Sequence, residues 1–229
     1  MAFLCVLGPA WADKAEYFET YGYATAEKGE LEVELWNDFF ANPAARYETE
    51  EEHGGHQISV EYGFTDHFMA EVYGVWRDDP ANQGITYTNT RLELRYRLGE
   101  YNRDRINTAL YLEYDKTAVA DFADELEGKL IFSRDLGDWN VTGNAVFVHD
   151  LVPGSPLEFQ YALGVNHPIG KHMLGSLETY VAPMDHQVFI IPSIHFPLSK
   201  KVYAGFGIDV QTSPTPVNAT LRTFVAQEF

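Results

Sequence analysis

The stretch TRLELRYRLGEYNRDRINTALYLEY, residues 90–114, alternates between two kinds of side chain on both sides of a polar turn. One set of alternate positions is mostly charged and holds Arg91, Glu93, Arg95, Arg97 and Glu113. The other set is mostly apolar and holds Leu92, Leu94, Tyr96, Leu98, Ile106, Thr108, Leu110, Leu112 and Tyr114. Successive side chains of a strand point to opposite faces of a sheet, so the stretch predicts a hairpin with one charged and one apolar face. Alternation alone leaves open which face is inside.

The same alternation recurs along the chain in segments of about ten residues, each bounded by turn residues. It predicts twelve strands, at residues 29–38, 56–65, 67–77, 85–98, 105–115, 124–133, 138–149, 156–166, 172–182, 187–197, 201–211 and 218–229. A further short segment, YFETYGYATAE at residues 17–27, is either a thirteenth strand or a lead-in to the first. Because no linker or change of composition divides the series, we predict a single domain over residues 13–229.

The connections between the predicted strands differ in an ordered way. Short turns such as GFTDHF, SRDLGDW and PLSKKV follow every second strand, and mostly longer acidic or proline-rich links lie between them. Short turns at one rim and longer loops at the other are typical of outer-membrane barrels. The pattern also favours an even number of strands.

The bulk composition excludes two classes of protein. Of the 229 residues, 34 are Asp or Glu and 16 are Lys or Arg, which gives a formal net charge of −18. A nucleic-acid partner is therefore not expected, because phosphate binding needs a basic surface. No apolar run approaches the roughly 20 residues that a membrane-spanning helix needs, so a helical membrane protein is not expected either.

The opening segment MAFLCVLGPAWA, residues 1–12, is apolar and ends in small residues around a tryptophan. These features predict a secretory signal peptide, and the missing basic start fits a truncated leader. A buried first strand and a lipoprotein site at Cys5 are the alternatives. Cys5 is the only cysteine, so a cleaved chain would have none left to form a disulfide.

Apart from Asp124 at the first position of the segment 124–133, one set of alternate positions carries no charge in the twelve predicted strands, and the opposite set carries nearly all of their charges. Such a pattern also fits a soluble barrel or a sandwich. Three features favour a membrane barrel with the apolar set outward. The chain ends on Phe229 in the apolar set. A twelve-stranded barrel is too wide for apolar side chains to fill, since about eight strands already give a filled interior.

The third feature is the position of the aromatic residues, which gather at the strand ends as expected where a membrane meets water. Near the short turns these are Phe64, Phe68, Tyr96, Phe132, Trp139, Phe196, Tyr203 and Phe229. Near the longer loops they are Trp36, Phe39, Phe40, Trp76, Tyr87, Tyr114 and Phe147. We therefore predict an all-β fold, a closed antiparallel up-and-down transmembrane β-barrel of about twelve strands.

The chain from KGELEVELW through LELRYRL and LYLEY to Phe229 resembles Gram-negative outer-membrane β-barrels of the porin-like kind. The resemblance implies a fold and a location in the bacterial outer membrane, with no catalytic residues carried over. It also implies outer-membrane lipid and lipopolysaccharide as surroundings, and recognition of the last strand, ending at Phe229, by the barrel-assembly machinery. A monomer is expected. Small acid-sugar channels are also twelve-stranded but favour basic lumens, so the acidic charges here argue against anionic solutes.

The charged set then becomes the candidate lining of a pore. The predicted pore-lining residues are Glu30, Glu32, Glu34, Glu61, Glu71, Arg91, Glu93, Arg95, Arg97, Glu113, Glu127 and Lys129. They favour a narrow passive channel for small polar or cationic solutes, because carboxylates in a confined space concentrate cations. Arg91 and Arg95 are expected to form cross-strand ion pairs with Glu113 and Glu71, as a brace or a constriction. An occluded barrel with a structural or adhesive role is the first alternative.

A second alternative is an outer-membrane hydrolase using His149 with Asp150, or Asp185 with His186, near the longer loops. No serine stands at a recognisable spacing from these pairs, so no catalytic residue is predicted and the protein is not expected to be an enzyme. The loop histidines His53 and His56 are flanked by glutamates but lack a metal-site pattern, so neither a metal nor a cofactor is predicted.

Overall fold

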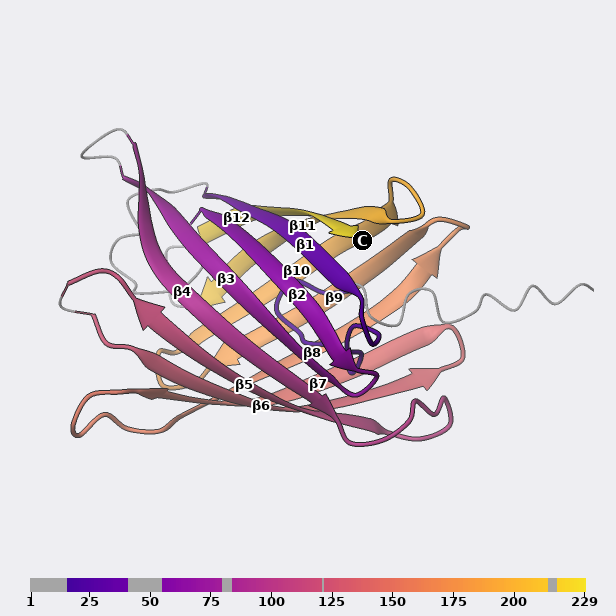
Figure 1. Ribbon diagram of the computed structural model, residues 1–229, viewed down its shortest axis with the longest axis horizontal. Helices are drawn as coiled ribbons and strands as arrows, with labels where there is room; N and C mark the ends of the chain where they lie inside the picture. Colours follow the sequence, from indigo (N-terminus) through magenta and orange to yellow (C-terminus); the bar gives the residue numbers. More distant parts are fainter. Residues whose placement is uncertain (1–15, 41–54, 80–83, 121, 214–217) are drawn as a thin grey trace, which may run out of the picture.

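The computed structural model describes residues 16–40, 55–79, 84–120, 122–213 and 218–229. The described residues form twelve strands in one closed barrel, in which every strand pairs antiparallel with its neighbours in sequence and β1 pairs with β12 (Figure 1). The strands are β1 (Leu31–Phe40), β2 (His56–Thr65), β3 (Phe68–Asp79), β4 (Gly84–Arg97), β5 (Asn107–Thr117), β6 (Glu125–Leu136), β7 (Trp139–Asp150), β8 (Glu158–Ile169), β9 (Met173–Ala182), β10 (Gln187–Pro197), β11 (Val202–Ser213) and β12 (Asn218–Glu228). The predicted fold class and the even strand number are confirmed.

The predicted strand bounds agree with the structure to within a few residues, and those of β2 and β10 coincide with it. The first strand begins two residues later than predicted. Gly29 has a positive φ of 87°, and the Glu30 N–H donates to the Glu27 carbonyl at 3.0 Å, so residues 27–30 form a turn. The predicted signal peptide, residues 1–12, lies outside the described residues. No helix long and apolar enough to cross a membrane occurs in the described part.

The apolar side chains face out of the barrel and the charged ones face in. Val60 and Leu92 are 44% and 42% exposed, whereas Glu71 and Glu93 on the opposite face are 3% and 0% exposed. A soluble protein would show the reverse arrangement, because water solvates charges and excludes apolar surface. The barrel exterior is therefore a surface for lipid. Phe229 belongs to this exterior, and its N–H donates to the Leu31 carbonyl at 2.9 Å beside the β1–β12 seam.

Exposed aromatic rings lie at both ends of the strands, as predicted, for example Phe64 and Trp139 at one rim and Phe39 and Tyr87 at the other. Below, the short-turn rim is the end where β2–β3, β4–β5, β6–β7, β8–β9 and β10–β11 are joined. The long-loop rim is the opposite end.

Two of the predicted rim aromatics instead point into the lumen. Trp36 stacks on Phe224 with ring centroids 4.7 Å apart, and the buried Tyr203 donates its hydroxyl to Glu32. Trp36 stands two residues from Glu34 and so shares its face of the strand, which is why the prediction for it was wrong.

Replacing Leu92 with arginine is expected to destabilise the barrel by roughly 2–4 kcal/mol, because a guanidinium near the middle of the membrane loses its water. The same change at Leu98, exposed at the short-turn rim, is expected to have an effect of about 0–1 kcal/mol, since it reaches the headgroups. Reversible unfolding in lipid vesicles measures both. Equal losses at the two positions would contradict the lipid-facing assignment.

Candidate functional site

Six glutamates on neighbouring strands stand side by side on the inner wall of the barrel. In the paired strands β1 to β6, each member is the direct partner of the next. This glutamate row consists of Glu32, Glu61, Glu71, Glu93, Glu113 and Glu127. Like charges placed directly opposite each other destabilise a sheet, so the row needs compensation from other groups.

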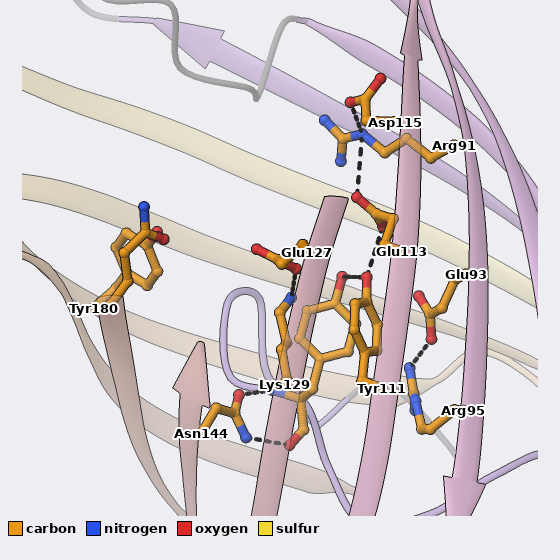
Figure 2. Close-up of polar contacts among 12 residues, drawn as sticks. Arg91, Glu93, Arg95, Tyr111, Glu113, Asp115, Glu127, Lys129, Asn144 and Tyr180 are labelled. Carbon is orange, nitrogen blue, oxygen red and sulfur yellow. Dashed lines mark hydrogen bonds and ion pairs between the residues drawn. The ribbon is translucent and has the colours of Figure 1, made fainter. Parts of the chain in front are cut away.

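The half of the row on β4 to β6 is compensated by basic side chains (Figure 2). Arg95 contacts Glu93 at 2.6 Å, and Lys129 contacts Glu127 at 2.6 Å. Arg91 lies 3.9 Å from Glu113 and 2.9 Å from Asp115, between the two carboxylates.

The pair between Arg91 and Glu113 is one of the two predicted. The other prediction is wrong, because Arg95 pairs with Glu93 on its own strand and not with Glu71. Only the contacts of Arg91 cross between strands, from β4 to β5, and the three basic side chains together offset the acidic groups on this side of the wall.

The half of the row on β1 to β3 has no such compensation. Among the described residues, no ion pair within 4.0 Å involves Glu32, Glu61 or Glu71. Glu71 accepts a hydrogen bond from the Tyr73 hydroxyl at 2.6 Å, and the same hydroxyl lies 2.9 Å from Glu93. One hydroxyl has one proton to donate, so two adjacent carboxylates share a single neutral donor. Acidic groups therefore outnumber basic ones on this side of the lumen.

The remaining predicted residues lie around the row. Glu34 is one inward position further along β1 and accepts a hydrogen bond from the Trp36 indole at 2.6 Å. Glu30 precedes β1 and accepts from the Glu27 N–H at 2.9 Å, which places it in the turn and outside the row. Arg97 lies over the Tyr23 ring, with its guanidinium carbon 5.6 Å from the ring centroid.

A segment that forms no strand lies inside the barrel. Residues 16–30, here called the lumenal segment, run along the inner wall before β1 begins, and Figure 1 shows them as an indigo trace within the barrel. The structure thus answers the question left open for residues 17–27, which are not a thirteenth strand. Tyr17, Phe18, Thr20 and Tyr23 are all buried.

The carboxylate of Glu178 on β9 holds the lumenal segment by its backbone. It accepts hydrogen bonds from three consecutive N–H groups, those of Phe18 at 2.8 Å, Glu19 at 2.8 Å and Thr20 at 2.7 Å. Hydrogen bonds to a carboxylate are about twice as strong as those between neutral groups. The bonds from Phe18 and Thr20 are buried, and the bond from Glu19 is partly buried. Glu178 is therefore the main anchor of the segment.

Other wall side chains continue this backbone recognition. The Asn144 amide accepts from the Tyr21 N–H at 2.7 Å and donates to the Tyr21 carbonyl at 2.9 Å (Figure 2). Ser176 donates to the Glu16 carbonyl at 2.7 Å, and Arg95 donates to the Ala24 carbonyl at 3.1 Å.

Two glycines make room for two aromatic rings of the segment. A Cβ atom at Gly164 on β8 would lie 2.5 Å from the Tyr17 ring, and one at Gly207 on β11 would lie 2.8 Å from the Phe18 ring. Neither glycine has a positive φ, so close approach explains their presence.

Further along the segment, the Tyr21 ring packs beneath Lys129. The ammonium lies 3.5 Å from the centroid of the Tyr21 ring, and the centroids of the Tyr21 and Tyr111 rings are 4.7 Å apart. Tyr23, two residues on, contacts β4 through Arg97.

The segment therefore contacts strands on widely separated parts of the wall, from β4 and β6 to β9 and β12. Arg222 on β12 adds ion pairs to Glu19 of the segment and to Asp38 of β1. A cavity of about 420 Å³ remains beside the segment, lined at one end by Glu34, Glu61 and Glu71 and reaching the β4–β5, β6–β7 and β8–β9 turns. The lumen is narrowed at the segment and acidic beside it.

Docking of the lumenal segment is expected to weaken as the pH rises. Burial raises the pKa of Glu16 from 4.5 to about 7, partly opposed by the Asn166 hydrogen bond at 2.7 Å. A carboxyl whose pKa is higher in the docked state stabilises docking at low pH. This contribution to the free energy of docking is lost as the pH rises from 4.5 to about 7. Hydrogen exchange of residues 16–20, corrected for intrinsic rates, should show falling protection over this window. The variant Glu16→Gln should weaken the trend, and an unchanged trend would contradict the assignment.

The histidines proposed for hydrolysis do not meet a nucleophile in the described residues. His149 contacts the Pro156 carbonyl at 3.2 Å. A Ser–His hydrogen bond occurs elsewhere, between Ser193 and His195 at 3.0 Å, but it is buried in the lumen beneath the Phe18 ring.

The possible metal site at the loop histidines gains no support either. His56 contacts Asn37 at 2.8 Å and Asp78 at 3.3 Å, and His53 lies outside the described residues. Within those residues, no group of three His, Cys, Asp or Glu side chains is placed to hold a metal ion.

Glu178 and Arg222 belong by their position to the charged set of the sequence, but the sequence does not mark them as site residues. The lumenal segment was also missed as an occupant of the barrel. Two features of the sequence could have indicated it: the density of aromatic residues in EYFETYGYA, residues 16–24, and the glycines Gly164 and Gly207 at inward positions of strands.

No protein-family model matches the sequence, and no curated protein matches it. Solved structures do match the fold. The KdgM porin in complex with disordered oligogalacturonate aligns over 86% of this chain and 99% of its own, with a TM-score of 0.63 and 9% identity. The COG4313 outer membrane channel from Pseudomonas putida F1 aligns over 93% and 100%, with a TM-score of 0.57 and 13% identity.

An enzyme shares the fold as well. The outer membrane phospholipase of Salmonella typhi, solved as a dimer with bound calcium, aligns over 95% of both chains with a TM-score of 0.53 and 10% identity. At these identities the similarity concerns the fold. The chain has the fold of bacterial outer-membrane barrels. With its apolar exterior, this fold places the protein in the outer membrane.

Proposed function

We propose that this protein is a narrow passive channel through which small polar or cationic solutes cross the outer membrane. The observation that carries the proposal is the glutamate row, whose half on β1 to β3 lacks basic partners and borders the lumenal cavity. Low-dielectric walls around a confined aqueous space strengthen the potential of fixed charges. Cations are therefore concentrated there and anions are repelled.

The acidic wall also separates this channel from one for acidic sugars. One structural neighbour is the KdgM porin in complex with oligogalacturonate, which is a polyanion. At one end of the cavity a polyanion would meet Glu34, Glu61 and Glu71 beside Arg95, which is already paired with Glu93. The other basic residues of the lining are Arg97, Arg103 and Lys171. We infer that in this protein the shared fold serves cationic or neutral solutes.

Planar-bilayer recording tests the proposal. The purified full chain should form small, cation-preferring channels at low ionic strength, and the preference should fall as salt rises, because the Debye length shrinks from about 30 Å at 0.01 M to 3 Å at 1 M. Channels that prefer anions would contradict the proposal.

An occluded barrel with a structural role is the second candidate, favoured by the lumenal segment and its contacts on several sides of the wall. Liposome swelling separates the two candidates. Entry of small neutral solutes into vesicles that contain the full chain supports the channel. Absence of both swelling and conductance supports the occluded barrel.

A further inference from the structure

The wall of the lumen holds the backbone of the lumenal segment as well as its side chains. Glu178 accepts hydrogen bonds from three consecutive N–H groups. Asn144 accepts from the N–H and donates to the carbonyl of one residue, and Ser176 donates to another carbonyl. All three wall residues are buried. Every peptide carries these backbone groups, so such contacts recognise a backbone bent as it is at residues 18–20 and depend only weakly on its sequence.

Sequence selectivity comes from two recesses in the same wall. The space above Gly164 takes the Tyr17 ring, and the space above Gly207 takes the Phe18 ring. The Tyr17 hydroxyl also donates to the Asn140 side chain at 3.0 Å. Phe18 packs against Phe224, with the two ring centroids 5.7 Å apart. Adjacent aromatic residues, the first with a hydroxyl and the second without, therefore fit this wall.

The barrel does not depend on the segment for closure. The ring of strands is complete through the β1–β12 pairing, and the segment adds no strand to it. It joins β1 through the turn at residues 27–30, at the short-turn rim. The segment can therefore leave the wall without breaking any strand pair.

From these observations we propose that the inner wall formed by β7 to β11 is a binding site for a peptide with two adjacent aromatic residues and a backbone bent as it is at residues 18–20. The lumenal segment occupies the site in cis. A peptide of the same class binds in trans when the segment is displaced. This site is separate from the glutamate row on β1 to β6 and goes beyond ion passage.

The test uses the full chain carrying Phe18→Ala and Thr20→Pro, which removes one ring and one N–H from the segment and leaves the wall intact. A fluorescent peptide of sequence EYFETYGYA, residues 16–24, is titrated against this variant and against the unmodified protein in detergent. Fluorescence anisotropy reports binding. The matched control is the same peptide N-methylated at the positions of Phe18, Glu19 and Thr20, which keeps every side chain and removes the donors to Glu178.

The peptide is expected to bind the variant saturably, and to bind the unmodified protein at least about tenfold more weakly because the segment competes. The methylated peptide should also bind the variant at least about tenfold more weakly, through loss of charge-assisted hydrogen bonds. Adding Glu178→Gln to the variant should lower affinity for the normal peptide alone. Hydrogen exchange of residues 16–24 confirms displacement, and heat-dependent mobility on a denaturing gel confirms a folded barrel.

Equal binding of the methylated and normal peptides would overturn the proposal, as would absence of binding to the displaced variant. A segment that stays protected despite both substitutions would also overturn it, because backbone contacts would then not control docking. None of these outcomes depends on ion passage. Peptide binding without conductance would contradict the proposed function and leave this site standing.

Discussion

Replacing Gly164 with leucine is expected to raise the single-channel conductance several-fold in the full chain. A Cβ at this position already lies 2.5 Å from the Tyr17 ring, so a leucine side chain occupies the volume of that ring. Close-packed interiors do not absorb such an overlap, and the segment is the part that can move. The wall strand stays in the β8–β9 pairing, in which Gly164 is the partner of Glu178.

The matched control is Gly128→Leu on β6. Gly128 is the partner of the exposed Leu112 and Phe147, and a Cβ there would meet only the Tyr111 carbonyl oxygen at 3.9 Å. This change should leave conductance unaltered. Hydrogen exchange of residues 16–24 should rise in Gly164→Leu alone. If hydrogen exchange shows that the segment has left the wall while the conductance is unchanged, the segment does not limit passage.

Neutralising Glu61 and Glu71 together, as Glu61→Gln/Glu71→Gln, is expected to remove most of the cation preference. At a distance of about 8 Å in water, each carboxylate contributes roughly 0.5 kcal/mol to the energy of a permeating cation. Two such changes lower the local cation concentration about fivefold, since 1.4 kcal/mol corresponds to a factor of ten. The ratio of cation to anion permeability, obtained from reversal potentials, measures the effect.

Glu100→Gln serves as the control, because Glu100 lies in the β4–β5 connection with its side chain 83% exposed, 2.8 Å from His67. It should change selectivity little. A double variant that keeps the full cation preference would mean that the uncompensated half of the glutamate row does not face the permeating ions.

Most of the fold could be predicted from the alternation of side chains. Because the period of a strand is two, one face free of charge over twelve segments predicted both the barrel and its inverted orientation. Glu93, 0% exposed, and Leu92, 42% exposed, show how completely neighbours in sequence are separated. The errors came where the same rule was not applied, as for Trp36, which shares its face with Glu34.

The glutamate row could be predicted only in part. Its members were identified as lumenal one strand at a time, but their alignment depends on the pairing between strands. That pairing shifts at irregularities between Gly63 and Thr65 and between Val75 and Trp76, which strand periodicity does not reveal. The ion pair of Arg95 with Glu93 was missed for a similar reason, because two residues on one strand were not considered as partners.

The lumenal segment was beyond the reach of local patterns. Its residues show no strand period, and its main anchor is distant, because Phe18 and Glu178 are 160 positions apart in the sequence. The three N–H groups converge on a carboxylate of β9, and the surface that the segment covers is formed by strands that lie far from it in the sequence.

The reversal potential under a potassium chloride gradient tests the central claim most directly, with the full chain and Gly164→Leu measured side by side. If the lumen is an acidic passage narrowed by the segment, both proteins give potentials of cationic sign, and the variant carries the larger current. A potential of anionic sign, or one near zero at low salt in the opened variant, would contradict the account.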